Sequence, residues 1–73
     1  MEKLDLHNIS HEKANILIEE FILINIDKLP IKIITGNSID MQKILMDYSK
    51  KLNINISPQN HKNLGSYVIT EKF

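Results

Sequence analysis

Apolar residues recur along this chain with two different periods, and these periods predict alternating strands and helices. Leu4 and Leu6 alternate with polar neighbours, so residues 3–7 are expected to form a short strand with both leucines toward a core. Ser10 is the expected N-cap of a helix that runs to about Asn25. The apolar positions of this helix lie on one face: Ala14, Leu17, Ile18, Phe21 and Ile22.

A second strand and a second helix follow the segment NIDKLP, in which Pro30 disfavours continuation of the first helix. Residues 31–35 (IKIIT) are rich in β-branched side chains and are expected to form a strand that is buried on both faces. Ser38 or Asp40 then caps the second helix. Its expected apolar stripe consists of Met41, Ile44, Leu45, Tyr48 and Leu52.

The last third of the chain is expected to supply two more strands. Residues 53–57 alternate, Pro58 ends this strand, residues 59–65 form a polar loop, and residues 66–73 form a fourth strand. The order is β-α-β-α-β-β, and the last two strands are expected to run antiparallel. The sequence therefore predicts a single α/β domain over residues 1–73. It is a two-layer sandwich in which a mixed four-stranded sheet carries two helices on one face and leaves the other face open.

Composition narrows the classes of function. The 73 residues include no cysteine, which excludes disulfides and thiolate metal sites. Nine basic and nine acidic residues cancel, and every basic residue is a lysine, so neither a general polyanion-binding surface nor an arginine clamp on phosphate is expected. No apolar run is long enough to span a bilayer and no signal peptide is evident, so a cytoplasmic protein without membrane contact is expected.

Asp5 and His7 are the first candidates for chemistry. Both point away from the leucines of the same strand, and His7 ends the strand beside the turn into the first helix. An imidazole titrates near neutral pH and acts as a general acid or base, with a nearby carboxylate to orient it. The structural alternative is a solvated Asp5 and a His7 that bonds to backbone. The spacing alone favours this alternative, because D-x-H is a common tripeptide.

The turn formed by Thr35, Gly36, Asn37 and Ser38 is the second candidate, because it ends a strand and leads into a helix. Ligands of parallel α/β units bind beyond the carboxyl ends of the strands, and N–H groups at a helix N-terminus hold phosphate. If the two strands are neighbours, His7 shares this crevice. The structural alternative is that Gly36 is present only for a positive φ.

The remaining histidines are expected to lie in solvent. His11 falls in the first turn of the first helix, and His61 with Lys62 falls in the expected polar loop, where contact with a polyanion is the functional alternative. Three histidines without a further carboxylate partner are a poor ligand set, so no dedicated metal site is predicted. A divalent metal ion is the one cofactor left open.

Taken together, these elements resemble the Smr (small MutS-related) domain. The opening signature of that family, L-D-L-H-G before a helix with early acidic residues, is matched by LDLHNISHEKA at residues 4–14. Its second motif, T-G-x-G after a strand, falls on Thr35 to Ser38 within IITGNS. Its closing glycines and β-branched run are matched by NLGSYVIT, which contains Gly65. The likeness covers nearly the whole chain and implies the same two-layer α/β sandwich.

The resemblance implies a role in nucleic-acid cleavage, since members of the family are implicated as DNA or RNA endonucleases, some at stalled ribosomes. It implies that His7 exchanges a proton with the attacking or leaving oxygen, and that Asp5 orients His7 or recruits a divalent ion. RNA is expected in preference to duplex DNA. The substrate-binding residues expected on this basis are Lys32, Thr35, Gly36, Asn37, Ser38 and Lys43.

Three departures from the family pattern bear on activity. Asn8 stands in place of the glycine of the first motif, a mild change because asparagine also adopts the left-handed conformation. Ser38 replaces the second glycine of T-G-x-G, and Gly65 alone remains of the closing glycines. The alternative function is therefore a non-catalytic module of the same fold that binds nucleic acid, a ribosome or a larger protein partner. A third is a protein partner on the open sheet face.

Overall fold

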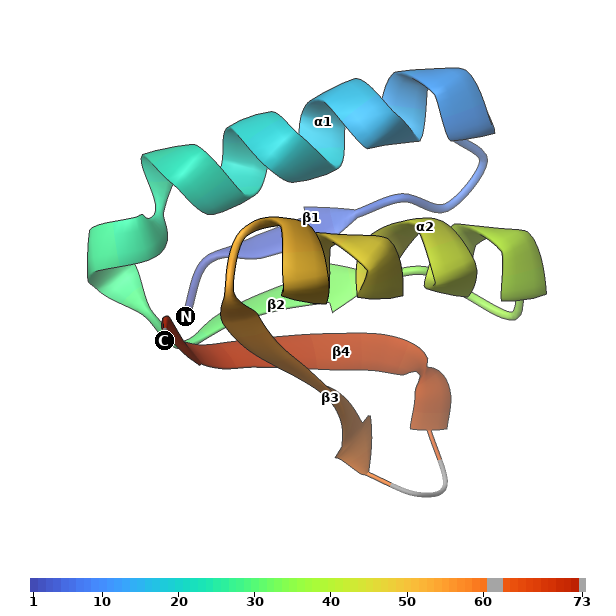
Figure 1. The fold of residues 1–73 in the computed structure, drawn as a ribbon. Helices are drawn as coiled ribbons and strands as arrows, with labels where there is room; N and C mark the ends of the chain where they lie inside the picture. The colour runs from blue at the N-terminus through green and yellow to red at the C-terminus, as the bar shows by residue number, and fades with distance from the viewer. Residues whose placement is uncertain (61–62, 73) are drawn as a thin grey trace.

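The computed structural model describes residues 1–60 and 63–72, and it has a layer of two helices on one side of a four-stranded sheet (Figure 1). The predicted α/β sandwich, with a mixed sheet and one open face, is confirmed. The elements are β1 (Lys3–Asp5), α1 (His11–Ile24), the 3₁₀ helix η1 (Ile26–Lys28), β2 (Ile31–Ile34), α2 (Ile39–Lys51), β3 (Ile54–Asn60) and β4 (Asn63–Lys72).

The strand order β1-β2-β4-β3 places the last strand of the chain inside the sheet. β1 and β2 are parallel, and β4 runs antiparallel to both β2 and β3, as expected for the last two strands. β2 and β3 therefore point the same way without being neighbours, because β4 lies between them. On the helix side of this pairing, Tyr67 and Ile69 of β4 lie opposite Ile33 and Ile31 of β2.

The buried face of each helix is the face that the apolar period predicts. Its fully or nearly fully buried members are Ala14, Ile18 and Ile22 of α1 and Met41, Leu45 and Tyr48 of α2. Ser10 is the N-cap of α1, since its Oγ accepts a hydrogen bond from the N–H of Lys13. Ser38, rather than Asp40, is the N-cap of α2, and its Oγ accepts from the N–H of Met41. Such caps typically contribute about 1 kcal/mol each.

The second strand is buried on one face and not on both, which corrects the expectation for residues 31–35. Ile31 and Ile33 are fully buried against the helices, whereas Lys32 and Ile34 on the other face are only half-buried. Two helices suffice to cover one side of the sheet, so the opposite side is exposed as it is in antiparallel sheets. The β-branched side chains of residues 31–35 therefore reflect a preference for strand conformation and not burial on both faces of the sheet.

The last two strands are longer than predicted, and the polar loop expected over residues 59–65 is wrong for most of its length. β3 continues through Pro58 to Asn60, so the proline does not end the strand. Proline is tolerated here because β3 is an edge strand, where an absent N–H costs no ladder hydrogen bond. The β3–β4 pairing also carries two register irregularities, one of them beside Pro58.

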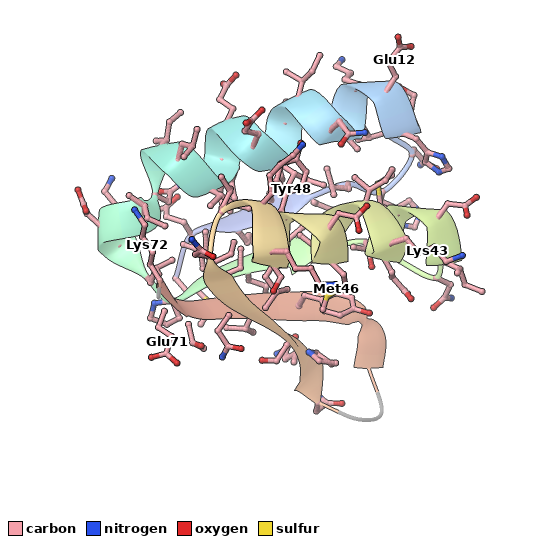
Figure 2. All side chains as sticks on the ribbon, in the orientation of Figure 1. Glu12, Lys43, Met46, Tyr48, Glu71 and Lys72 are labelled. Carbon is pink, nitrogen blue, oxygen red and sulfur yellow. The ribbon has the colours of Figure 1, made fainter. Side chains whose placement is uncertain are left out.

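Tyr48 connects the two helices, and Figure 2 shows its side chain between α1 and α2. The ring is buried, and the hydroxyl donates a hydrogen bond to the backbone carbonyl of Asn15 at 3.0 Å, with Asn15 Oδ1 at 3.3 Å. The Nζ of Lys51 lies 5.0 Å from the ring centroid. Burial raises the pKa of Tyr48 above 10.0, and the negative charge of Glu19 adds to this effect.

Replacing Tyr48 with phenylalanine tests this connection. The variant keeps the ring and loses the hydrogen bond to Asn15, so the free energy of unfolding should fall by about 1 kcal/mol in urea unfolding. Tyr67→Phe is the matched control, because it removes a hydroxyl to which no described residue is hydrogen-bonded. An equal loss in both variants would contradict a specific role of the Tyr48 hydroxyl.

The same variant tests the ionisation of Tyr48. Because its pKa is higher in the folded chain, the folded state holds the phenolic proton to a higher pH than the unfolded state does. The stability that this group contributes is full below the ordinary pKa of 10.0 and is lost as the pH rises above it. The advantage of the wild type over Tyr48→Phe should therefore shrink as the pH rises from about 10 to about 11. A constant difference over that range would refute the assignment.

Candidate functional site

Five of the residues predicted to carry chemistry, His7 and Thr35 to Ser38, meet at a surface cavity of about 250 Å³, which we term the β1–β2 cavity. Asp5 does not line it. β1 and β2 are parallel neighbours, so their carboxyl ends lie at the same edge of the sheet and the segments that follow them face one another. His7 and the turn from Thr35 to Ser38 therefore lie together, as expected if the first two strands are neighbours. The cavity is lined by Leu6, His7, Asn8, Ile9, His11, Thr35, Gly36, Asn37, Ser38 and Met41.

Asp5 holds the backbone of the turn that follows β1. Its Oδ1 accepts a hydrogen bond of 2.9 Å from the backbone N–H of His7. Asn8 has a φ of 62°, the left-handed conformation expected of a residue in place of glycine. No described residue forms a hydrogen bond with the imidazole of His7. Asp5 therefore positions His7 through the main chain, and the imidazole is available to a ligand.

The turn that follows β2 lies directly against this imidazole. Gly36 has a φ of +68°, a left-handed conformation that favours glycine, so the backbone conformation explains why glycine occupies this position. A Cβ placed on Gly36 would lie 3.7 Å from Nδ1 of His7, which is ordinary van der Waals contact. The imidazole and the turn are thus close enough to contact one phosphate group together, which is the geometric requirement for a shared site.

β4 reaches the same turn through Gly65. The carbonyl oxygen of Gly65 accepts hydrogen bonds from the N–H groups of Thr35 at 2.8 Å and of Gly36 at 3.1 Å. A Cβ on Gly65 would lie 3.0 Å from the carbonyl oxygen of Gly36, a backbone atom that has little room to move. A residue with a Cβ at this position would therefore require the Gly36 backbone to shift by a few tenths of an ångström, and glycine requires no shift.

The two hydroxyl groups of the turn have different roles. Thr35 is buried, and its Oγ1 donates to the carbonyl oxygens of Gly36 at 3.0 Å and Gly65 at 3.3 Å, so this hydroxyl maintains the turn. Ser38 uses its oxygen as the N-cap of α2 and still has a hydroxyl proton to donate into the cavity. Asn37 is exposed at the rim.

Both helices begin at the β1–β2 cavity, α1 at His11 and α2 at Ile39. The first turn of a helix carries the positive end of the helix dipole and N–H groups that have no partner within the helix. These groups favour an anion. The arrangement therefore combines two positive helix ends, one serine hydroxyl and the imidazoles of His7 and His11, which suits a phosphate whose ester oxygens exchange protons.

The structure places the two candidate lysines away from the cavity and places His11 in it. Lys32 lies on the open face of the sheet, next to Lys3 in the β1–β2 register. Lys43 is exposed on α2 (Figure 2). His11 is exposed, as the sequence predicts, but it also lines the cavity together with His7. The sequence feature that could have indicated this position is that His11 follows His7 by four residues, with only a short turn between them.

The described residues hold no group of three or more histidine, cysteine, aspartate or glutamate side chains placed to bind a metal ion. Within the same residues, no helix is long and apolar enough to cross a membrane. His61 and Lys62, the alternative contacts to a polyanion, lie outside the described residues.

Gly65→Ala tests the contact that shapes the cavity. The added Cβ would lie 3.0 Å from the Gly36 carbonyl oxygen, which is tighter than most Cβ contacts, so β4 and the turn should move apart and the free energy of unfolding should fall by about 1 to 3 kcal/mol. Chemical-shift changes in a ¹H–¹⁵N NMR spectrum should centre on residues 35–38 and on His7. Ser66→Ala, one residue along the same strand, is the matched control. Changes confined to β4 itself would show that the contact does not govern the turn.

No protein-family model and no curated protein matches this sequence. The resemblance to the Smr domain therefore rests on the motifs at residues 4–14 and at Thr35 to Ser38 and on the closing segment with Gly65. These three segments converge at one end of the sheet, since Gly65 bonds to the turn and the turn contacts His7.

Proposed function

We propose that this chain is an Smr-like nucleic-acid-processing domain that binds and cleaves phosphodiesters at the β1–β2 cavity, with RNA preferred to duplex DNA. One observation carries the proposal. Nδ1 of His7 lies 3.7 Å from the Cβ position of Gly36, in a cavity that the N-terminal ends of both helices also line. An imidazole beside an anion-binding turn is the minimal arrangement for proton transfer on a phosphate ester.

In this proposal, His7 accepts the proton of the attacking oxygen as the new P–O bond forms, and a proton returns to the leaving oxygen as the old P–O bond breaks. Asp5 is a positioning residue, because its carboxylate holds the main chain of His7. Ser38 and the first N–H groups of α2 hold the phosphate, and Thr35 and Gly36 shape the turn that presents them. Lys32 and Lys43 act, if at all, on flanking phosphates outside the cavity.

A single-stranded substrate fits these features better than a duplex. The cavity has a volume of about 250 Å³, which suits one phosphate with its sugar. A single strand can bring one such unit into the cavity more readily than a duplex can. The formal net charge is +0, so binding depends on a few local contacts and not on a general field. We place this activity in the cytoplasm, with RNA as the substrate and a ribosome or a larger protein as a further partner.

A binding module without turnover is the second candidate, and a specific observation favours it. The carboxylate of Asp5 accepts a hydrogen bond from the backbone N–H of His7 and is not paired with the imidazole, so no described carboxylate orients the imidazole for proton transfer. Such a site binds a phosphate more readily than it cleaves one. The two functions share the cavity and differ in whether His7 transfers a proton.

Incubation with labelled single-stranded RNA tests the proposal. Wild-type protein should cut the RNA, and His7→Ala should lower the rate by at least about a hundredfold, since general acid–base catalysis typically contributes that much. His11→Ala shows whether the second imidazole of the cavity contributes. Lys50→Ala, an exposed change on α2, is the control for protein handling, and circular dichroism confirms the fold of each variant.

The outcomes separate the two functions. Equal cleavage by the wild type and His7→Ala would reject His7 as a catalytic residue. If neither protein cleaves RNA or single-stranded DNA but both bind with an affinity that falls with salt, the binding module is the function. Absence of both cleavage and binding would reject the β1–β2 cavity as a nucleic-acid site.

A further inference from the structure

The free edge of β1 is a second surface with the features of an interface. β1 is an edge strand whose one neighbour in the sheet is β2. The main-chain groups of Glu2 and Leu6 are hydrogen-bonded to β2. Because main-chain groups alternate in direction along a strand, the N–H and C=O groups of Lys3 and Asp5 point outward from the sheet. An edge of this kind readily pairs with another strand.

The two edges of the sheet differ in regularity. β3 carries Pro58 and two register irregularities, which are common means of preventing edge-to-edge pairing. β1 contains neither. The β1 edge therefore keeps the regular main-chain spacing that pairing with another strand requires.

An apolar groove lies beside this edge, between β1 and α1. Its volume is about 400 Å³. The apolar lining is Leu4, Leu17, Phe21 and Ile24, and the polar lining is Glu2, Glu20, Asn25 and Lys28. Ile24 is 65% exposed and the neighbouring Leu23 is 55% exposed, although both are large apolar side chains. Apolar surface that adjoins unpaired strand groups is typical of a protein–protein interface.

The charges of β1 identify the partner as a second copy of this chain. If two β1 strands run antiparallel with Leu4 opposite Leu4, Lys3 of each copy lies opposite Asp5 of the other. Lys3 and Asp5 are also the residues whose main-chain groups point outward, so each Lys–Asp pair exchanges two backbone hydrogen bonds. The paired Leu4 side chains then bring the two apolar grooves together on the helix side.

Other registers of the same pairing are unfavourable. A shift by one residue would place side chains that belong to opposite faces against each other. A shift by two residues would place Lys3 opposite Lys3, or Asp5 opposite Asp5, and like charges directly opposite are destabilising. Charge therefore selects a single antiparallel register.

We propose that this chain forms a two-fold dimer by pairing β1 with β1 of a second copy, which joins the two four-stranded sheets into one. The grooves between β1 and α1 close against each other at the two-fold axis. The β1–β2 cavities stay accessible, because they lie at the carboxyl ends of β1, and antiparallel pairing places those ends on opposite sides of the dimer. The dimer does not depend on the function proposed for that cavity.

Charge exchange tests the register. Lys3→Asp alone and Asp5→Lys alone each place like charges opposite one another, so each variant should have a dimer dissociation constant at least about tenfold higher than the wild type in sedimentation-velocity experiments. An equimolar mixture of the two variants should recover the dimer. One chain then carries two carboxylates on β1 and the other carries two ammonium groups, so opposite charges face each other in both pairs. Lys72→Glu, a charge reversal outside β1, should leave the dimer unchanged.

Lys3→Asp decides the question even if Asp5→Lys fails to fold through loss of the hydrogen bond to His7. Lys3 is exposed, and the new carboxylate would lie beside Lys32 in the sheet, so this variant should fold. A wild-type chain that remains monomeric at about 100 μM would overturn the proposal, because a weaker interface is not a specific one at working concentrations. A dimer that persists unchanged in Lys3→Asp would place the interface elsewhere and overturn it equally.

Discussion

The contact between Gly65 and the turn after β2 determines the geometry of the end of the sheet at which the β1–β2 cavity lies. One carbonyl oxygen accepts hydrogen bonds from Thr35 and Gly36, and the backbones approach so closely that a Cβ on Gly65 would lie 3.0 Å from the carbonyl oxygen of Gly36. This contact holds the turn against the imidazole of His7. It exists because β4, the last strand, lies beside β2 and not at the edge of the sheet.

Most polar groups around the cavity are used to hold the main chain. The carboxylate of Asp5, the hydroxyl of Thr35 and the oxygen of Ser38 all bond to backbone groups within a few residues. The groups that face a ligand are then the imidazoles of His7 and His11, the hydroxyl proton of Ser38 and the first N–H groups of the helices. This set accords with a chain of zero net charge, because helix ends attract phosphate without any cationic side chain.

The two edges of the sheet also differ from each other. The β3 edge is protected by a proline and by irregular pairing, whereas the β1 edge presents regular main-chain groups beside exposed apolar side chains. The cavity lies at the end of β1, and the proposed interface lies along its side. A three-residue strand can therefore serve two surfaces, since its carboxyl end and its free edge face different directions.

The sequence by itself determined the features that depend on local period. The alternation at Leu4 and Leu6 and the spacing of apolar residues in each helix predicted the elements, their order and the buried faces of both helices. It also placed His7 at the end of a strand predicted over residues 3–7 and Gly36 just after the next strand, and so at one edge if those strands are neighbours. In the structure β1 ends earlier, at Asp5. The structure has the other features because the spacing of apolar residues within one segment depends on residues that are close together in the chain.

Only the tertiary structure decided the remaining features, which depend on contacts between residues far apart in the chain. It placed β4 between β2 and β3, extended β3 through Pro58 because an edge strand tolerates proline, and turned His11 toward the same cavity as His7. It also showed that Gly65 lies in close backbone contact with Gly36, 29 positions earlier in the chain. No local pattern encodes such an approach, because it arises only when strand pairing brings the two segments together.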